Sequence, residues 1–180
     1  MQETPQQYTQ RILGYVARRD PVRVQRATPK KIERVIRSLR PRQLRWRPAP
    51  GKWSIVEILA HLAETELVGG YRIRMILSAN GTPIQAFDQD AWARNGDYAA
   101  RDPRLSLALF RALREANLAL LSSLPRKKWK NYGMHAERGK ETIARVAAMF
   151  AGHDVNHLQQ IAHLARASRR TKPGKSGASR

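Results

Sequence analysis

Hydrophobic residues recur at helical spacing along four long segments of the chain and along one short segment near the N-terminus. Spacings of three and four residues place these side chains on one face of a helix, and the alternation that is typical of strands is not evident. The pattern therefore predicts an all-α protein. The predicted helices span residues 8–16, 29–39, 54–80, 103–124 and 141–166.

Capping signals predict where the long helices begin. Thr28 is a candidate N-cap followed by a proline, which suits the first position of a helix. Ser54 and Glu57 have the spacing of a capping box, in which each side chain accepts a hydrogen bond from the backbone of the other. Asp102 is the candidate cap of the third long helix. The predicted buried face of that third helix consists of Leu105, Leu109, Leu113, Ala116 and Leu120.

The connection between the second and third long helices, residues 81–102, is far longer than an antiparallel helical hairpin needs. A helix of about 26 residues is about 39 Å long, and about 20 extended residues cover about 65 Å. The chain can therefore return to its starting end, which leaves the two helices parallel. In a second interpretation, compatible with the first, residues 84–95 with Phe87 and Trp92 form a lid over a pocket.

The composition indicates one domain with appendages. Of the 180 residues, 42% are hydrophobic, and we expect a four-helix bundle over residues 25–166, an amphipathic arm over 1–24 and a basic disordered tail over 167–180. No apolar run approaches the ~20 residues that span a bilayer, and the first ten residues contain no hydrophobic leader. We therefore expect a cytoplasmic protein without membrane contact. The chain has no cysteine, so any thiol chemistry needs a thiol from a second substrate.

The net charge of +20 lies mainly at the two ends of the chain. Residues 1–52 carry +11, residues 53–165 carry +3 and residues 166–180 carry +6. Basic termini attract nucleic acid without sequence preference, so non-specific nucleic-acid contact is one expectation. The simpler interpretation is that Arg-rich helices present a solvated outer face.

Two histidines of the last helix occupy positions where core residues are expected. His153 and His157 are four residues apart, so their side chains leave the same face of the helix. A buried imidazole needs partners for its nitrogen atoms, and a shared metal ion provides one for each ring. Alternatively, one ring packs in the core and the other bonds a carbonyl. The stripe that contains both histidines is formed by Ile143, Val146, Phe150, Ile161 and Leu164.

His61 favours the metal interpretation. It lies roughly 10 Å from the start of the second long helix, and His157 lies roughly 13 Å from the end of the last helix. If these helices are antiparallel, the three imidazoles reach similar depth. Three ligands from two facing helices, with positions left for water or substrate, are typical of a catalytic metal. We therefore predict that His61, His153 and His157 bind one divalent ion, which is zinc, nickel or iron.

Other polar residues are candidates for roles around this ion. Gln160, one turn after the last ligand, can bond the second nitrogen of a ligand or a substrate. Glu64 lies one turn after the first ligand, and Asp88 reaches the site if the long connection folds inward. Asp154 is about 100° around the helix from its histidine neighbour and is predicted to face solvent. No catalytic residue is assigned, and no metal role is assigned to His135 or His163.

Two stretches of the chain resemble the DinB-like superfamily. Residues 52–62 read KWSIVEILAHL and are followed by Glu66, and residues 139–161 contain HDVNHLQQI. The resemblance covers roughly residues 25–165. It implies a four-helix bundle of up-down-down-up order, the three matching histidines as metal ligands, and often a homodimer.

The resemblance also implies an enzyme. The superfamily includes proteins described as metal-dependent hydrolases and others that use small thiols such as bacillithiol or mycothiol, so the ion is expected to activate water or a low-molecular-weight thiol against a small-molecule substrate. The last helix lacks the glutamate beside the first histidine that metalloproteases use as a base, which favours thiol transfer over hydrolysis. Two alternatives stay open, namely a nucleic-acid-binding protein with a structural metal and a metal-binding bundle without catalysis.

Overall fold

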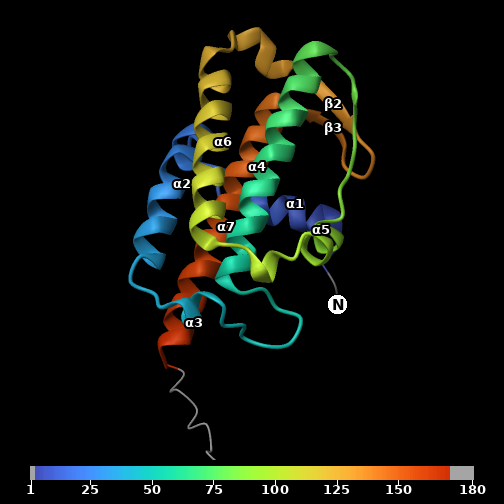
Figure 1. The fold of residues 1–180 in the computed structure, drawn as a ribbon. Coiled ribbons are helices and arrows are strands. Elements are labelled where there is room, and N and C mark those ends of the chain that lie inside the picture. Colours follow the sequence, from blue (N-terminus) through green and yellow to red (C-terminus); the bar gives the residue numbers. More distant parts are fainter. Residues whose placement is uncertain (1–2, 171–180) are drawn as a thin grey trace, which may run out of the picture.

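Four long helices pack side by side in the computed structural model, which describes residues 3–170 (Figure 1). These helices are α2 (Pro21–Ile36), α4 (Ile55–Ser78), α6 (Pro103–Ser123) and α7 (Ile143–Arg170). Helices α2 and α7 run down the view of Figure 1, and α4 and α6 run up it. With the bundle turned upside down from this view, the order is up-down-down-up, with α4 parallel to α6, and the predicted four-helix bundle is confirmed. Each of the four helices contacts two of the others, in the ring α2–α7–α4–α6.

Short elements precede the first bundle helix or connect one bundle helix to the next. They are α1 (Pro5–Gly14), α3 (Pro41–Leu44), β1 (Pro83–Ile84), α5 (Gln89–Asn95), the 3-10 helices η1 (Tyr98–Ala100) and η2 (Arg126–Lys130), β2 (Tyr132–His135) and β3 (Gly139–Thr142). Strand β2 pairs in parallel with β1 and antiparallel with β3, which ties the crossover between α4 and α6 to the hairpin before α7. The expectation of a chain without strands was wrong, because strands of two and four residues are too short to show alternation.

Helix α2 begins at Pro21 and not at the predicted Pro29. Asp20 caps it, since its side chain accepts hydrogen bonds from two backbone N–H groups of the first turn. Pro29 lies inside the helix and has no N–H for the carbonyl of Gln25, four residues earlier. Arg114 of α6 donates to that carbonyl at 2.9 Å, which satisfies the group that the internal proline leaves free.

Helix α6 buries a different face from the one that its apolar pattern predicts. Leu105 is 70% exposed and Leu109 is 48% exposed. The residues that α6 buries are Ser106, Leu107, Phe110, Arg114, Asn117, Leu118 and Leu121. The prediction was wrong because two large polar residues interrupt the inward face, so the apolar positions alone indicate a neighbouring face.

The core consists of two hydrophobic clusters with a polar layer between them. One cluster surrounds the first half of α4 and includes Ile55, Ile58, Leu59, Leu62, Phe110 and Ile161. The other surrounds its last turns and includes Ile73, Ile76, Leu118, Leu121, Ile143 and Val146. Along α4, α6 and α7, the residues between these two clusters include Glu66, Arg114 and Asp154, which are buried.

Helix α1 packs against α7, so the predicted N-terminal arm is part of the fold (Figure 1). Ile12 is fully buried, and its backbone carbonyl approaches α7 so closely that a Cβ added to Gly152 would overlap it. Arg11 donates to the side chain of Asn156 at 2.8 Å. The last residues of the predicted arm, 21–24, belong to α2.

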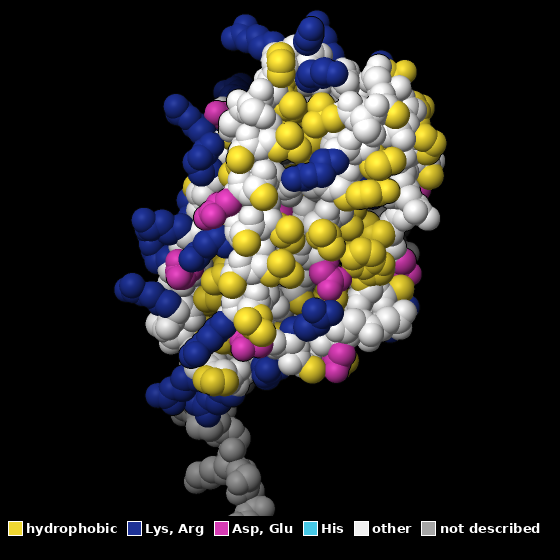
Figure 2. Space-filling view, turned by 45° about the horizontal axis from the view of Figure 1, so that its top comes forward, with side chains coloured by type: hydrophobic (Ala, Val, Ile, Leu, Met, Phe, Trp, Pro, Cys, Tyr) yellow, Lys and Arg dark blue, Asp and Glu magenta, His cyan; other side chains and the backbone are white. Residues whose placement is uncertain are grey.

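The C-terminal helix is longer than predicted. Residues 167–170 of the predicted tail continue α7, and Ser168 is buried, whereas residues 171–180 lie outside the described part of the chain. Among the described helices, none has the length and apolarity to cross a membrane. Figure 2 shows Lys and Arg side chains along the edge where α2 lies, which is the basic face expected of an Arg-rich helix.

Candidate metal centre

Three histidine side chains converge between the antiparallel helices α4 and α7. His61 lies seven residues after the N-cap Ser54, whose capping box with Glu57 fixes the start of α4 as predicted. His153 Nε2 lies 3.0 Å from His61 Nε2 and 3.1 Å from His157 Nε2. Within the described residues, this is the one group of three or more His, Asp or Glu side chains that could hold a metal ion.

The spacing of the three nitrogens suits a tetrahedral ion. Bonds of about 2.0–2.1 Å from zinc to histidine place the nitrogens of a tetrahedral site about 3.3 Å apart. The observed separations of 3.0 and 3.1 Å need only a small expansion. Three imidazoles would leave a fourth position for a substrate group or water, and this donor set is acceptable to zinc, nickel and iron.

Neighbouring side chains orient the rings. The Nδ1 of His157 lies 2.9 Å from Gln160 Oε1, so the ring donates from Nδ1 and keeps the lone pair on Nε2. Of the two roles considered for Gln160, the structure shows the bond to the second nitrogen of a histidine. Trp53 packs against His61 with ring centroids 4.9 Å apart, and the Thr65 hydroxyl lies 3.4 Å from His61 Nε2.

Burial keeps the imidazoles neutral. His61 and His157 are buried, and His153 is partly exposed. Burial, and then the neighbouring His157, lowers the pKa of His61 well below its usual value. Burial followed by the other two histidines lowers the pKa of His153 in the same way. Burial also lowers the pKa of His157 to about 4. Neutral imidazole is the form that binds metal ions.

A buried ion-pair network lies beside the histidines. Arg114 of α6 donates to Asp154 Oδ2 at 2.5 Å and to Glu66 Oε2 at 2.8 Å, and Asn117 donates to the other oxygen of Glu66 at 2.8 Å. The prediction that Asp154 faces solvent was wrong, since this side chain is 1% exposed. Asp154 lies on the side of α7 that faces α6, where it meets the guanidinium of Arg114. Because Asp154 follows His153 in the chain, this ion pair also fixes the rotation of α7 at the site.

A pocket of about 350 Å³ adjoins the histidines. Its wall includes Tyr8 of α1, His61 and Arg72 of α4, Phe87 of the crossover, His135 of β2, and Phe150 and His153 of α7. Trp92 packs behind Phe87 with ring centroids 5.0 Å apart. The crossover therefore returns the chain to the start of the bundle and also forms one wall of the pocket.

Two of the predicted polar residues serve the crossover and do not face the histidines. Glu64 accepts hydrogen bonds from the Tyr98 hydroxyl at 2.6 Å and from Arg101 at 3.2 Å. Asp88 is exposed and caps α5, since its Oδ1 accepts from two backbone N–H groups. Neither residue belongs to the pocket wall, and the exposed His163 does not either.

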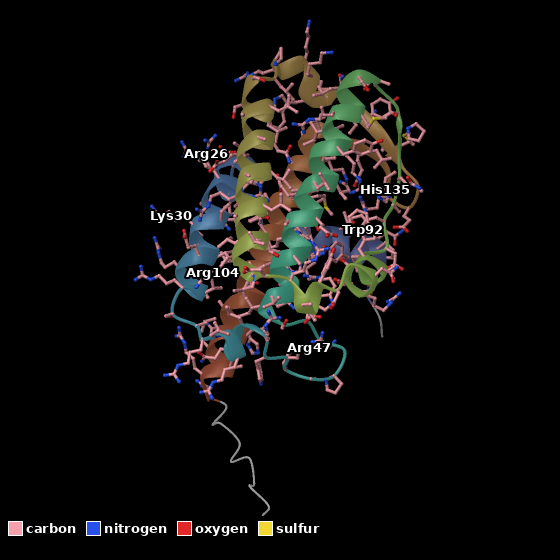
Figure 3. All side chains as sticks on the ribbon, in the orientation of Figure 1. Arg26, Lys30, Arg47, Trp92, Arg104 and His135 are labelled. Carbon is pink, nitrogen blue, oxygen red and sulfur yellow. The ribbon has the colours of Figure 1, made fainter. Side chains whose placement is uncertain are left out.

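Sequence reasoning missed two residues of the pocket wall, Arg72 and His135. Arg72 lies eleven residues after His61, which is about three helical turns and therefore the same face of α4. That phase was a usable signal. His135 lies on a strand that the sequence does not predict, and Figure 3 shows it on the same side of the bundle as Trp92.

The fold and the converging histidines define a class of proteins, a four-helix bundle with a candidate three-histidine metal site. Residues 26–161 match the model of the DinB superfamily, and the chain belongs to this superfamily. The resemblance of the sequence to that superfamily is thus confirmed.

Known proteins resemble this chain over most of its length. It is 27% identical over 147 residues to "Putative metal-dependent hydrolase YfiT" of Bacillus subtilis, covering 81% of this chain and 82% of that protein. It is 25% identical to a protein of the same description from Oceanobacillus iheyensis, covering 76% of this chain and 78% of that one. The solved structure of YfiT, described as having an unusual four-helix bundle topology, has a TM-score of 0.78 and 22% identity, and the match covers 94% of this chain and 92% of YfiT. This structural match supports the fold.

Proposed function

We propose that this chain is a metal-dependent enzyme in which His61, His153 and His157 hold one divalent ion, with zinc, nickel and iron as candidates. The observation that carries the proposal is the convergence of three Nε2 atoms beside a pocket. The description of its relatives as metal-dependent hydrolases supports it. When bound, such an ion lowers the pKa of a coordinated water or thiol and so supplies a nucleophile at neutral pH.

The protein side chains prepare the site for this chemistry. Gln160 holds the ring of His157 with its Nε2 lone pair free, and Arg114 of α6 links Asp154 of α7 to Glu66 of α4, which holds these two helices in register. The pocket is large enough for a small molecule, and the aromatic rings of Tyr8 and Phe87 form part of its wall. The protein side chains named here therefore orient the metal ligands and bind the substrate. In this proposal none of them transfers a proton, and the nucleophile loses its proton when it binds the ion.

Within this function we favour a low-molecular-weight thiol over water as the nucleophile. Among the described residues, no Asp or Glu joins the three histidines in one cluster, so no carboxylate base for water lies among the candidate ligands, and the carboxylates of the pocket wall, Glu3 and Glu137, lie outside this cluster. A thiol has a pKa near 8.5 and loses its proton without such a base. The substrate is then a small electrophile that receives the thiol, and hydrolysis is the second candidate.

Elemental analysis of protein purified without an affinity tag tests the metal site. We expect one ion per chain in the parent and in the control His163→Ala, and its loss in His157→Ala. A parent that contains no ion and binds none on titration with zinc, nickel or iron would contradict the proposal. Loaded protein is then assayed with a small thiol plus a chloronitroarene and, separately, with aryl esters, so that thiol loss and ester cleavage distinguish the two nucleophiles.

A further inference from the structure

Arg72 is a buried cation without a carboxylate partner among the described residues. It is 8% exposed, and none of the ion pairs of residues 3–170 includes it. Its Nη2 donates to the backbone carbonyl of Gln85 at 2.6 Å, and its guanidinium lies 5.8 Å from the Phe87 ring centroid. Its Nε is buried and has no hydrogen-bond acceptor in the described part of the chain. The crossover thus holds this guanidinium in place without neutralising it.

His135 offers a second donor without an acceptor. The side chain is 3% exposed, and its Nδ1 accepts a hydrogen bond from the backbone N–H of Glu137 at 3.2 Å. In a neutral ring that accepts at Nδ1, the hydrogen resides on Nε2. This Nε2 is buried and has no partner within residues 3–170. Buried donors without acceptors are rare in native proteins and require an explanation.

Both residues line the pocket that also contains His61 and His153, and their two unpaired donor atoms are buried behind its surface. Arg72 is on the same face of α4 as His61, about three turns further on, and side chains on a helix tilt toward its N-terminus. The guanidinium therefore extends back along the pocket toward the histidines. A second arginine of the wall, Arg138, is already paired with both oxygens of Glu141. Arg72 is thus the arginine of this wall that forms no ion pair among the described residues, and the acidic charges that act on it are those of Glu141 and Glu137.

We propose that the pocket binds a substrate or co-substrate with a carboxylate, which Arg72 and the Nε2–H of His135 receive while its reactive end lies at the three histidines. Two donors, one of them carried by the guanidinium of Arg72, match the two oxygens and single charge of a carboxylate. A phosphate carries a larger charge, and one arginine of the described wall, Arg72, is free of an ion pair to balance it. This inference rests on the proposed function only in assigning the reactive end to the metal site.

Two thiols of equal length test the carboxylate subsite in zinc-loaded protein. The probes are 6-mercaptohexanoate and 6-mercaptohexanol, which differ at the end remote from sulfur, and binding is measured by isothermal titration calorimetry. We expect the carboxylate to bind about tenfold tighter or more, as for a hydrogen bond to a charged group. In Arg72→Gln this preference should fall to about one-third of its value or less, and Arg72→Lys should retain part of it.

The control is Arg104→Gln. Arg104 is exposed on α6, lines a different cavity and is labelled in Figure 3 on the opposite side of the bundle from His135. This variant should keep the full preference, and His135→Phe should lose part of it. Equal affinity for the two probes in the parent, or a preference that survives Arg72→Gln, would overturn the carboxylate subsite.

Metal-free protein separates this inference from the proposed function. Hexanoate and hexan-1-ol have no thiol, so their binding does not depend on the ion. We expect hexanoate, and not hexan-1-ol, to raise the melting temperature of the metal-free parent and of Arg104→Gln, and to have no effect on Arg72→Gln. A protein that binds no ion but shows this pattern retains the carboxylate subsite and loses the proposed function. A loaded protein without the pattern retains the function and loses the subsite.

Discussion

Lowering the pH from 7.5 to 5 should destabilise the metal-free protein through the imidazoles of the site. In an unfolded chain histidine titrates near pH 6.5, whereas burial lowers the folded pKa of His157 to about 4. Between these values the unfolded state binds more protons, so stability that is present above pH 6.5 is lost as the pH falls toward 4. At pH 5, one site of this kind costs about 2 kcal/mol.

His61 and His153 act in the same direction, since burial lowers the pKa of both well below the usual value. Asp154 acts in the opposite direction because burial raises its pKa. Variants isolate the histidine contribution. Urea unfolding in the presence of a chelator, followed by circular dichroism at several pH values, should give a loss of stability in the parent that exceeds the loss in His157→Leu by about 2 kcal/mol. The exposed-site control His163→Ala should behave like the parent. If His157→Leu and the parent depend on pH equally, His157 is not held neutral in the folded protein.

Three further predictions concern the ion, the buried network and the N-terminal helix. Chelation should lower the melting temperature of the loaded parent by about 5–11 °C, because an ion at a hundredfold excess over Kd stabilises the folded state by about 2.7 kcal/mol. It should barely change the melting temperature of His61→Ala. Equal shifts in the two proteins would exclude His61 as a ligand. Arg114→Met should lower the free energy of unfolding, measured in urea, by about 3–5 kcal/mol because it leaves two buried carboxylates without their cation. A loss below about 1 kcal/mol, which is typical of surface ion pairs, would contradict the assignment of a buried ion pair. Gly152→Ala should release α1 from α7 and speed proteolytic cleavage before α2. The control Gly14→Ala should not, because a Cβ added at Gly14 meets nothing within 4 Å. Cleavage of Gly152→Ala at the parent's rate would refute the close approach of the Ile12 carbonyl to Gly152.

Local signals in the sequence predict much of the bundle. The capping box of Ser54 and Glu57 and the aspartate cap at Asp102 are observed as hydrogen bonds, so the starts of α4 and α6 are where the sequence places them. The depth of His61 and His157 along their helices follows from the rise per residue, and the antiparallel arrangement then brings them together. These inferences succeed because each depends on one helix or on one pair of helices.

The pattern of apolar residues does not predict the polar side chains that face the interior of the bundle. Arg114 and Asn117 occupy the buried face of α6, and Asp154 occupies a buried position on α7, although each residue type is typical of a surface. Apolar periodicity identifies the inward face only where the core is apolar. Each of these side chains is buried because its partner lies on another helix, and a single sequence does not pair residues between helices.

The pocket depends on still more distant pairings. His135 reaches its place because β2 pairs with β1 of the crossover and with β3, and those strands are too short for a periodic pattern. Arg72 carries a usable phase signal on α4, but the contact that holds it, the carbonyl of Gln85, comes from a loop. Thus the convergence of the three histidines follows from helix geometry, and the other residues of the pocket wall follow from tertiary structure.

The polar layer and the histidine site complement each other electrostatically. In the layer, the guanidinium of Arg114 faces two buried carboxylates, Asp154 and Glu66, so the acidic groups outnumber the base. The adjacent histidines are neutral and bring no compensating charge. In our proposal a divalent ion on those histidines adds positive charge beside this acidic excess, where burial weakens screening and favours a cation.

The same polar layer joins all four bundle helices, since Arg114 of α6 also donates to the backbone of α2 and its carboxylate partners lie on α4 and α7. In the proposed function, metal binding and the packing of the bundle are therefore coupled through the buried charges, and on that proposal we expect the ion to affect the stability of the whole fold and not of the site alone.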